Sequence, residues 1–170
     1  MGVELVVRCR LPGMSLREFR RFAAEATALL GEGASEVVVS LVGEREIHRL
    51  NARYRGKDRP TDVLAFATRE GERMPGGEQL LGDIVIGVPV ARRQAVERGR
   101  SLAEELRVLF VHGLLHLLGY DHERSPAEAR RMRRKELWVL ARATPQGSAR
   151  LCRGRAAPKG RRRPLPAASA

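Results

Sequence analysis

The chain has 170 residues, 43% of them hydrophobic, and a formal net charge of +12 at pH 7. This length fits one domain with a real core, and the charge favours an anionic partner, most often a nucleic acid. The two cysteines, Cys9 and Cys152, are too far apart to indicate a disulfide framework or a thiolate metal site, and no segment resembles a signal peptide or a membrane span, so we expect a cytoplasmic protein.

The first half of the chain alternates between short valine-rich runs and longer amphipathic runs, which are typical of strands and helices respectively. Ser15 and Glu18 have the spacing of a capping box, and the run Glu36–Val42 is typical of an interior strand. The elements expected here are a strand at Val3–Cys9, a helix from Leu16 to Leu30, a strand at Glu36–Val42, a helix from about Glu44 to Tyr54 and a strand at Asp62–Phe66.

The second half begins with a polar, glycine-rich segment, Thr68–Gln79, which predicts a surface loop. A strand at Leu80–Val88 follows, then helices from Pro89 to Gly99, from a capping box at Ser101 to Gly119, and from Ser125 to about Ala143. Helices and strands alternate irregularly, which predicts a single α/β or α+β domain with a mixed sheet of about four strands covered by helices. The order of the strands does not follow from this pattern.

Three of the four histidines lie between Val111 and His122. His112 and His116 are four residues apart, so on a helix they share one face, and Gly119 allows the chain to turn back toward His122. Three neutral imidazoles are typical of catalytic zinc, which keeps a fourth position open and lowers the pKa of bound water to roughly 7. The sequence therefore predicts one Zn²⁺ per chain on a central helix, held by His112, His116 and His122.

Two further features remain open on sequence alone. Arg55, Lys57 and Arg59 lie in a tight loop bounded by Gly56 and Pro60, and such a loop can clamp phosphate or be an ordinary solvated turn. Residues 144–170 contain seven basic and no acidic residues, which predicts a disordered basic tail that either tethers the protein to RNA or is only solvated. His48, the fourth histidine, is expected to be an ordinary helix residue.

A protease is the main rival reading of the histidines. Their spacing equals that of the metzincin motif His-Glu-x-x-His-x-x-Gly-x-x-His. In those proteases the residue after the first histidine is the glutamate that acts as general base, whereas Gly113 has no side chain. We therefore disfavour a peptidase, and the basic loop directs metal-assisted hydrolysis toward a phosphodiester instead.

Three segments together resemble the YbeY-type endoribonucleases, a bacterial family of rRNA maturation factors. His112–His122 is similar throughout to the family's His-Gly-x-Leu-His-Leu-x-Gly-Tyr-Asp-His. Leu50–Phe66 is similar to its Leu-Asn-x-x-Tyr-Arg-Gly-Lys-Asp-x-Pro-Thr-Asp-Val-Leu-Ser-Phe-Pro, and Leu81–Ile86 to its strand motif. The chain departs from the pattern at Ala65 and Ala67, where the family has serine and proline, and this concerns the wall of the cleft rather than the histidines.

The resemblance implies a zinc endoribonuclease domain over residues 1–143, with an α/β fold and zinc on the three histidines. It also implies a catalytic role for Arg55, and it implies cleavage of single-stranded RNA in 16S rRNA 3′-end maturation and ribosome quality control. Lys57 and Arg59 are candidate RNA contacts, and Asp121 is a candidate for orienting a ligand or capping a turn. The expected partners are rRNA precursors, the small ribosomal subunit, and ribosomal proteins or assembly GTPases. An RNA-binding assembly factor with a structural zinc is the non-enzymatic alternative.

Overall fold

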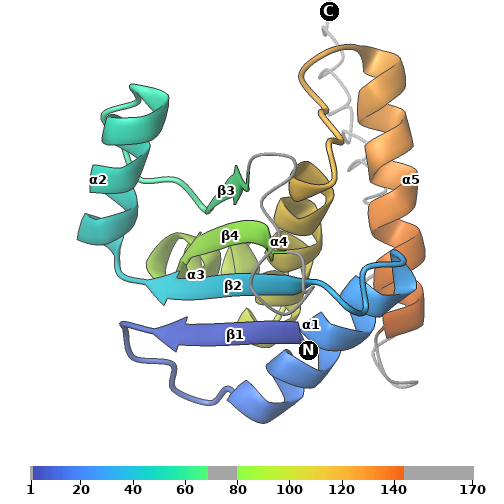
Figure 1. Ribbon diagram of the computed structural model, residues 1–170. Coiled ribbons are helices and arrows are strands. Elements are labelled where there is room, and N and C mark those ends of the chain that lie inside the picture. The colour runs from blue at the N-terminus through green and yellow to red at the C-terminus, as the bar shows by residue number, and fades with distance from the viewer. Residues whose placement is uncertain (1, 69–79, 144–170) are drawn as a thin grey trace, which may run out of the picture.

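The computed structural model describes residues 2–68 and 80–143 (Figure 1). The predicted tail and nearly all of the predicted loop at Thr68–Gln79 lie outside the described residues. The elements in chain order are β1 (Gly2–Val7), α1 (Leu16–Leu29), β2 (Glu36–Val42), α2 (Glu44–Arg55), β3 (Val63–Ala67), β4 (Leu80–Gly87), α3 (Val88–Glu97), α4 (Leu102–Leu117) and α5 (Pro126–Ala143). In this part of the chain, none of the helices combines the length and the apolar character needed to cross a membrane.

The four strands form one mixed sheet in the order β1-β2-β4-β3, which confirms the predicted fold class and strand number. β2 pairs in parallel with both β1 and β4, and β3 pairs antiparallel with β4. The parallel connection between β1 and β2 runs through α1, as parallel neighbours require a crossover. β2 is therefore interior, as its continuous run of valines predicts.

The hydrophobic core lies between one face of the sheet and helices α1 and α4. Val39 of β2 and Ile84 of β4 are fully buried there, and Phe110 of α4 meets the rings of Phe19 and Phe22 of α1 edge-on at centroid distances of 6.0 and 6.4 Å. α5 packs on the outer side of α1 and α4, whereas α2 covers part of the opposite face of the sheet (Figure 1). This arrangement makes α4 the central helix and presses it against β3 and β4.

Gly82 allows β3 to lie close to β4. Its φ angle is +143°, and a Cβ atom on it would lie 2.1 Å from the carbonyl oxygen of Phe66. We expect Gly82→Ala to reduce the free energy of unfolding by about 3 kcal/mol, since both backbone strain and a backbone clash oppose it. Urea denaturation measures this, and Gly33→Ala is the control, because its Cβ would meet Ala28 at an ordinary 3.5 Å. Equal losses in the two variants would contradict the prediction.

Some predicted boundaries differ from the structure. β1 ends at Val7 rather than Cys9: its last pairing with β2 is Val7 with Leu41, after which only the Arg8 amide donates to the Leu41 carbonyl. The predicted capping box of the first helix is half formed: the Ser15 side chain accepts a hydrogen bond from the Glu18 amide. The box at Ser101 is complete, as predicted.

Candidate metal site and cleft

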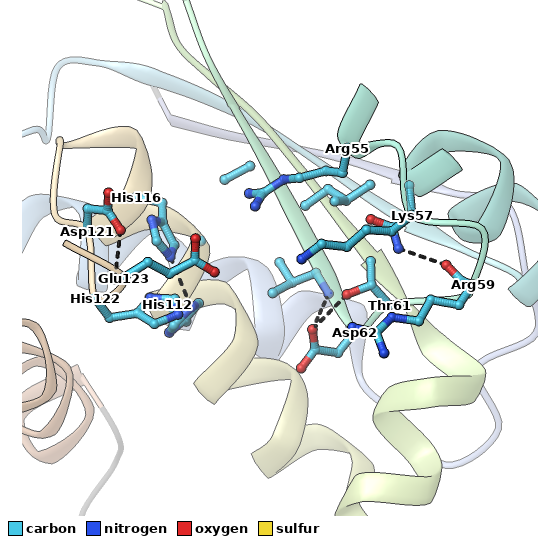
Figure 2. Close-up of a pocket in the computed structure, with 15 residues that line it drawn as sticks. Arg55, Lys57, Arg59, Thr61, Asp62, His112, His116, Asp121, His122 and Glu123 are labelled. Carbon is cyan, nitrogen blue, oxygen red and sulfur yellow. Dashed lines mark hydrogen bonds between the residues drawn. The ribbon is translucent and has the colours of Figure 1, made fainter. Parts of the chain in front are cut away.

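The end of α4 brings three histidines together. The helix stops in a hydrogen-bonded turn in which the Gly119 amide donates to the His116 carbonyl and the Tyr120 amide donates to the Leu115 carbonyl, at 3.0 Å each. Gly119 has the predicted left-handed conformation, with φ of +87°. The chain therefore reverses, and His122 returns to the side of the helix that carries His112 and His116 (Figure 2).

The three imidazoles form a compact cluster that can hold a metal ion. One ring nitrogen from each lies within 4.8 Å of the other two, and the Nε2 atoms of His112 and His116 are 3.1 Å apart. A tetrahedral ion with Zn–N bonds of about 2.0–2.1 Å needs ligand nitrogens about 3.4 Å apart. The donor set and its spacing are therefore suited to zinc, and the expected juxtaposition of the three residues is present.

A buried carboxylate that the sequence analysis did not identify orients one of these rings. Glu136 of α5 lies 2.6 Å from Nδ1 of His112, and Arg133 donates to its other oxygen at 3.3 Å. Burial alone would raise the pKa of Glu136, but the hydrogen bonds from His112 and Arg133 outweigh it and hold the pKa below its usual value. The ionised carboxylate accepts the Nδ1 proton, so the lone pair of the neutral imidazole is on Nε2, which faces the cluster.

The surroundings of His116 lower the pKa of its imidazole. Burial lowers its pKa below the ordinary value, and the neighbouring imidazoles of His112 and His122 lower it further. The Asp121 carboxylate opposes these effects and raises the pKa in part, whereas the guanidinium of Arg55 lowers it from across the cleft. A neutral imidazole is the form that binds a metal ion, so these groups favour the ligand state at neutral pH.

Glu136 provides a test of this arrangement. We expect Glu136→Gln to weaken zinc binding by about 10–100-fold, because the amide does not hold the Nδ1–H tautomer as the carboxylate does. Competition with a chromophoric chelator measures the affinity. Glu128→Gln, on the same helix but paired with Arg131, is the control. Parent-like affinity in the Glu136 variant would show that this carboxylate has no role in orienting His112.

Basic side chains face the histidines across a cleft of about 470 Å³. The predicted loop residues Arg55, Lys57 and Arg59 all line it, and Figure 2 shows Arg55 and Lys57 extending toward the histidine cluster from the opposite wall. Ala65 of β3 also lines the cleft, so the departure from the serine of the family pattern does fall on its wall. The structure thus brings together the two motifs, which are more than fifty residues apart in sequence.

The backbone of the basic loop is anchored to α2. Gly56 ends the helix in a left-handed conformation with φ of +65°, and its amide donates to the Ala52 carbonyl. The buried side chain of Asn51 donates to the carbonyl of Arg59 at 2.7 Å. The cationic groups are therefore attached to a fixed backbone. Asn51 lies within Leu50–Phe66, the segment that resembles the family pattern, but a polar residue type alone does not predict this contact.

Two acidic residues, Asp121 and Glu123, lie beside the histidine cluster, and the side chain of Asp121 caps the turn. Asp121 accepts a hydrogen bond from the Glu123 amide at 2.9 Å, which supports the turn-capping alternative over a role in orienting a ligand. Glu123 also lines the cleft, and the sequence analysis did not single it out. His48 pairs with Asp58 at 2.7 Å on the surface, outside the cluster, as expected.

Comparisons with known proteins agree with this architecture. The family model described as Endoribonuclease YbeY matches residues 14–144. Curated proteins named Endoribonuclease YbeY are 51% identical over 75% of the chain in Anaeromyxobacter sp. and 51% identical over 72% of it in Pelotomaculum thermopropionicum; the alignments cover 64% and 82% of those proteins. The solution structure of a Thermotoga maritima protein superposes with a TM-score of 0.54 at 27% identity, covering 82% of this chain and 89% of that one.

Proposed function

The chain belongs to the endoribonuclease YbeY family, and we propose that it is a zinc-dependent hydrolase of RNA phosphodiester bonds, acting on single-stranded segments. The observation that carries this proposal is the cleft in which a cluster of three imidazoles faces Arg55, Lys57 and Arg59. Imidazoles bind a metal ion and guanidinium groups bind phosphate, so the two walls suit the two halves of a phosphodiester hydrolysis site.

The residues of the cleft have distinct roles in this proposal. His112, His116 and His122 hold zinc, with Glu136 fixing the orientation of His112. The ion supplies a Lewis acid for the scissile phosphate and lowers the pKa of a water molecule. Arg55 stabilises the charge that develops on the phosphoryl oxygens, since its planar fork can donate two parallel hydrogen bonds to phosphate. Lys57 and Arg59 hold the neighbouring phosphates and keep the strand in position.

The size and charge of the cleft support a single RNA strand as the substrate. A cleft of about 470 Å³ is in the range that accommodates small molecules and therefore takes nucleotides one or two at a time. This supports a single strand as the reacting segment. We propose the 3′ end of precursor 16S rRNA as substrate, within ribosome maturation and quality control in the cytoplasm. Ribosomal proteins and assembly GTPases of the small subunit are the proposed partners.

The protease alternative is weakened further by packing. At Gly113, where a metzincin has its glutamate, a Cβ atom would lie 2.9 Å from Cγ2 of the buried Ile84. The helix therefore contacts β4 at the position from which the general base of a peptidase would project. A glutamate at this position would require the buried Ile84 side chain or α4 to shift.

The proposal is tested with full-length protein of measured zinc content and a single-stranded RNA that carries a 16S 3′ precursor sequence. We expect cleavage that a chelator abolishes and added zinc restores, with no hydrolysis of peptide substrates. If the zinc-loaded protein leaves both the free RNA and precursor small subunits intact, the enzyme assignment is wrong. A non-catalytic assembly factor would then be the better description.

A further inference from the structure

The outer surface of α5 is strongly basic. The helix has six basic and two acidic residues, and only one of the two carboxylates lies near the exposed cations. Glu136 is buried against His112, and Glu128 already pairs with Arg131. The α5 basic face, as we define it, consists of Arg130, Arg131, Arg134, Lys135 and Arg142.

These five cations share one side of the helix. Their separations of three, four and seven residues place them together, opposite the buried positions that include Met132, Val139 and Ala143. Arg130, Arg131, Arg134 and Arg142 are exposed. Among the described residues, no carboxylate forms an ion pair with Arg130, Arg134, Lys135 or Arg142. Like charges at this spacing destabilise a helix, and among the described residues a carboxylate pairs with only one of the five cations, so ion pairing does not explain the cluster.

The α5 basic face begins beside the metal cluster. His122 is followed within four residues by the start of α5, and the guanidinium of Arg131 lies 5.3 Å from the ring centre of Tyr120, in the turn that leads to His122. From Arg130 to Arg142 the face extends about 18 Å along the helix axis. Figure 1 shows that α5 is the outermost helix on this side of the molecule.

We propose that the α5 basic face binds the sugar-phosphate backbone of the RNA that flanks the segment in the cleft. This inference rests on the proposed function, since it takes RNA to be the substrate. Trp138 lies among these cations, but Lys135 and Arg142 lie over its ring at 4.5 and 4.4 Å. The ring is therefore not free to stack on a base. The contacts are electrostatic and independent of sequence.

An anionic membrane is a poorer match for the same charges. A helix that binds a membrane surface inserts an exposed apolar face between the lipid headgroups. The apolar side of α5, with Met132, Val139 and Leu140, is buried against the rest of the domain. The exposed side offers mainly cations, two of which cover the Trp138 ring, and this suits a phosphate backbone in water.

The test compares two double variants of the full chain. Arg130→Gln/Arg134→Gln removes two charges from the α5 basic face. Arg17→Gln/Arg21→Gln removes two charges at the same spacing from exposed positions of α1, where Glu18 and Glu25 make the surface mixed. Fluorescence anisotropy with a labelled RNA, a hairpin carrying a single-stranded cleavage segment, gives the affinity across a salt series. RNA integrity is checked on a gel.

We expect the α5 double variant (the α5 pair) to bind the RNA about tenfold more weakly than the parent at 0.1 M salt. The slope of its plot of log affinity against log salt should be smaller in magnitude by about two. Each single substitution should give about half of this change in slope. The α1 pair should behave like the parent. Equal affinities and slopes for the two pairs would overturn the proposal. So would an α5 pair that keeps its RNA affinity but loses binding to vesicles of anionic lipid.

Cleavage provides a separate readout. A short single-stranded oligonucleotide that occupies only the cleft should be cleaved equally by the parent and both pairs. If the parent cleaves no RNA while the α5 pair still shows the shallower salt dependence, the proposed activity fails and the α5 basic face stands. If the parent cleaves RNA and the two double variants bind RNA alike, the proposed activity stands and the role of the α5 basic face is wrong.

Discussion

Replacing His116 by alanine is expected to abolish stoichiometric zinc binding. His116 contacts both other histidines of the cluster, with its Nε2 atom 3.1 Å from that of His112 and its ring centre 5.1 Å from that of His122. Loss of one of three protein ligands should weaken binding by more than the roughly 10–100-fold that follows loss of an outer hydrogen-bond partner. Zinc content after gel filtration, measured by atomic emission, should therefore fall from about one ion per chain to near zero.

The fourth histidine provides the matched control. His48→Ala removes an imidazole that pairs with Asp58 on the surface, outside the cluster and the cleft, and it should leave the zinc content unchanged. Circular dichroism should show the parent's helix content in both variants, because His116 is not part of the buried core. Stoichiometric zinc in the His116 variant would remove this residue from the ligand set.

Local sequence patterns were sufficient to predict most of the elements. β2 at Glu36–Val42 has the predicted bounds, and α5 begins and ends where Pro126 and Ala143 indicated. The helix stop at Gly119 and the capping box at Ser101 were predicted from residue type and spacing alone. These features depend on neighbours within a few positions of the chain, so a single sequence contains the necessary information.

Features that join distant segments could not be predicted in this way. The strand order β1-β2-β4-β3 depends on which edges meet, and short apolar runs do not encode that choice. Glu136 belongs to a run of charged residues that is typical of a solvated helix face, yet it is buried against His112, 24 positions earlier. Asn51 likewise holds the Arg59 carbonyl across a turn. In each case the partner is set by tertiary packing.

The juxtaposition of the basic loop and the histidines could be predicted only in part. Both motifs were identified in the sequence, but only as separate features, and charge alone left the loop with two readings. Packing of α4 against β3 and β4 places the histidines on one wall, and Asn51 and Gly56 fix the loop on the other. The shared cleft thus favours the phosphate-binding reading over the solvated turn.

The reversal Arg55→Glu is expected to lower the rate of RNA cleavage by about 10²–10³-fold while zinc stays bound. Arg55 and His116 line the same cleft, and under the proposed function the guanidinium stabilises the charge that develops on the scissile phosphate. A glutamate there would repel the substrate as well as remove the donor pair. Single-turnover cleavage of the precursor RNA, with zinc content measured on the same sample, separates these effects from metal loss.

Two further variants decide whether the loss of cleavage rate comes from the position of Arg55 or from overall charge. Arg53→Glu makes the same reversal two residues earlier on α2, at an exposed side chain that stacks on Tyr54 and does not line the cleft, so its rate should be near that of the parent. Arg55→Lys retains the charge without the planar fork, and it should recover only part of the rate. Equal rates for the Arg53 and Arg55 reversals would mean that overall charge governs binding. Under the proposed chemistry only Arg55 faces the reacting phosphate. The cleavage rate should therefore be highest for the parent, lower for Arg55→Lys and lowest for Arg55→Glu.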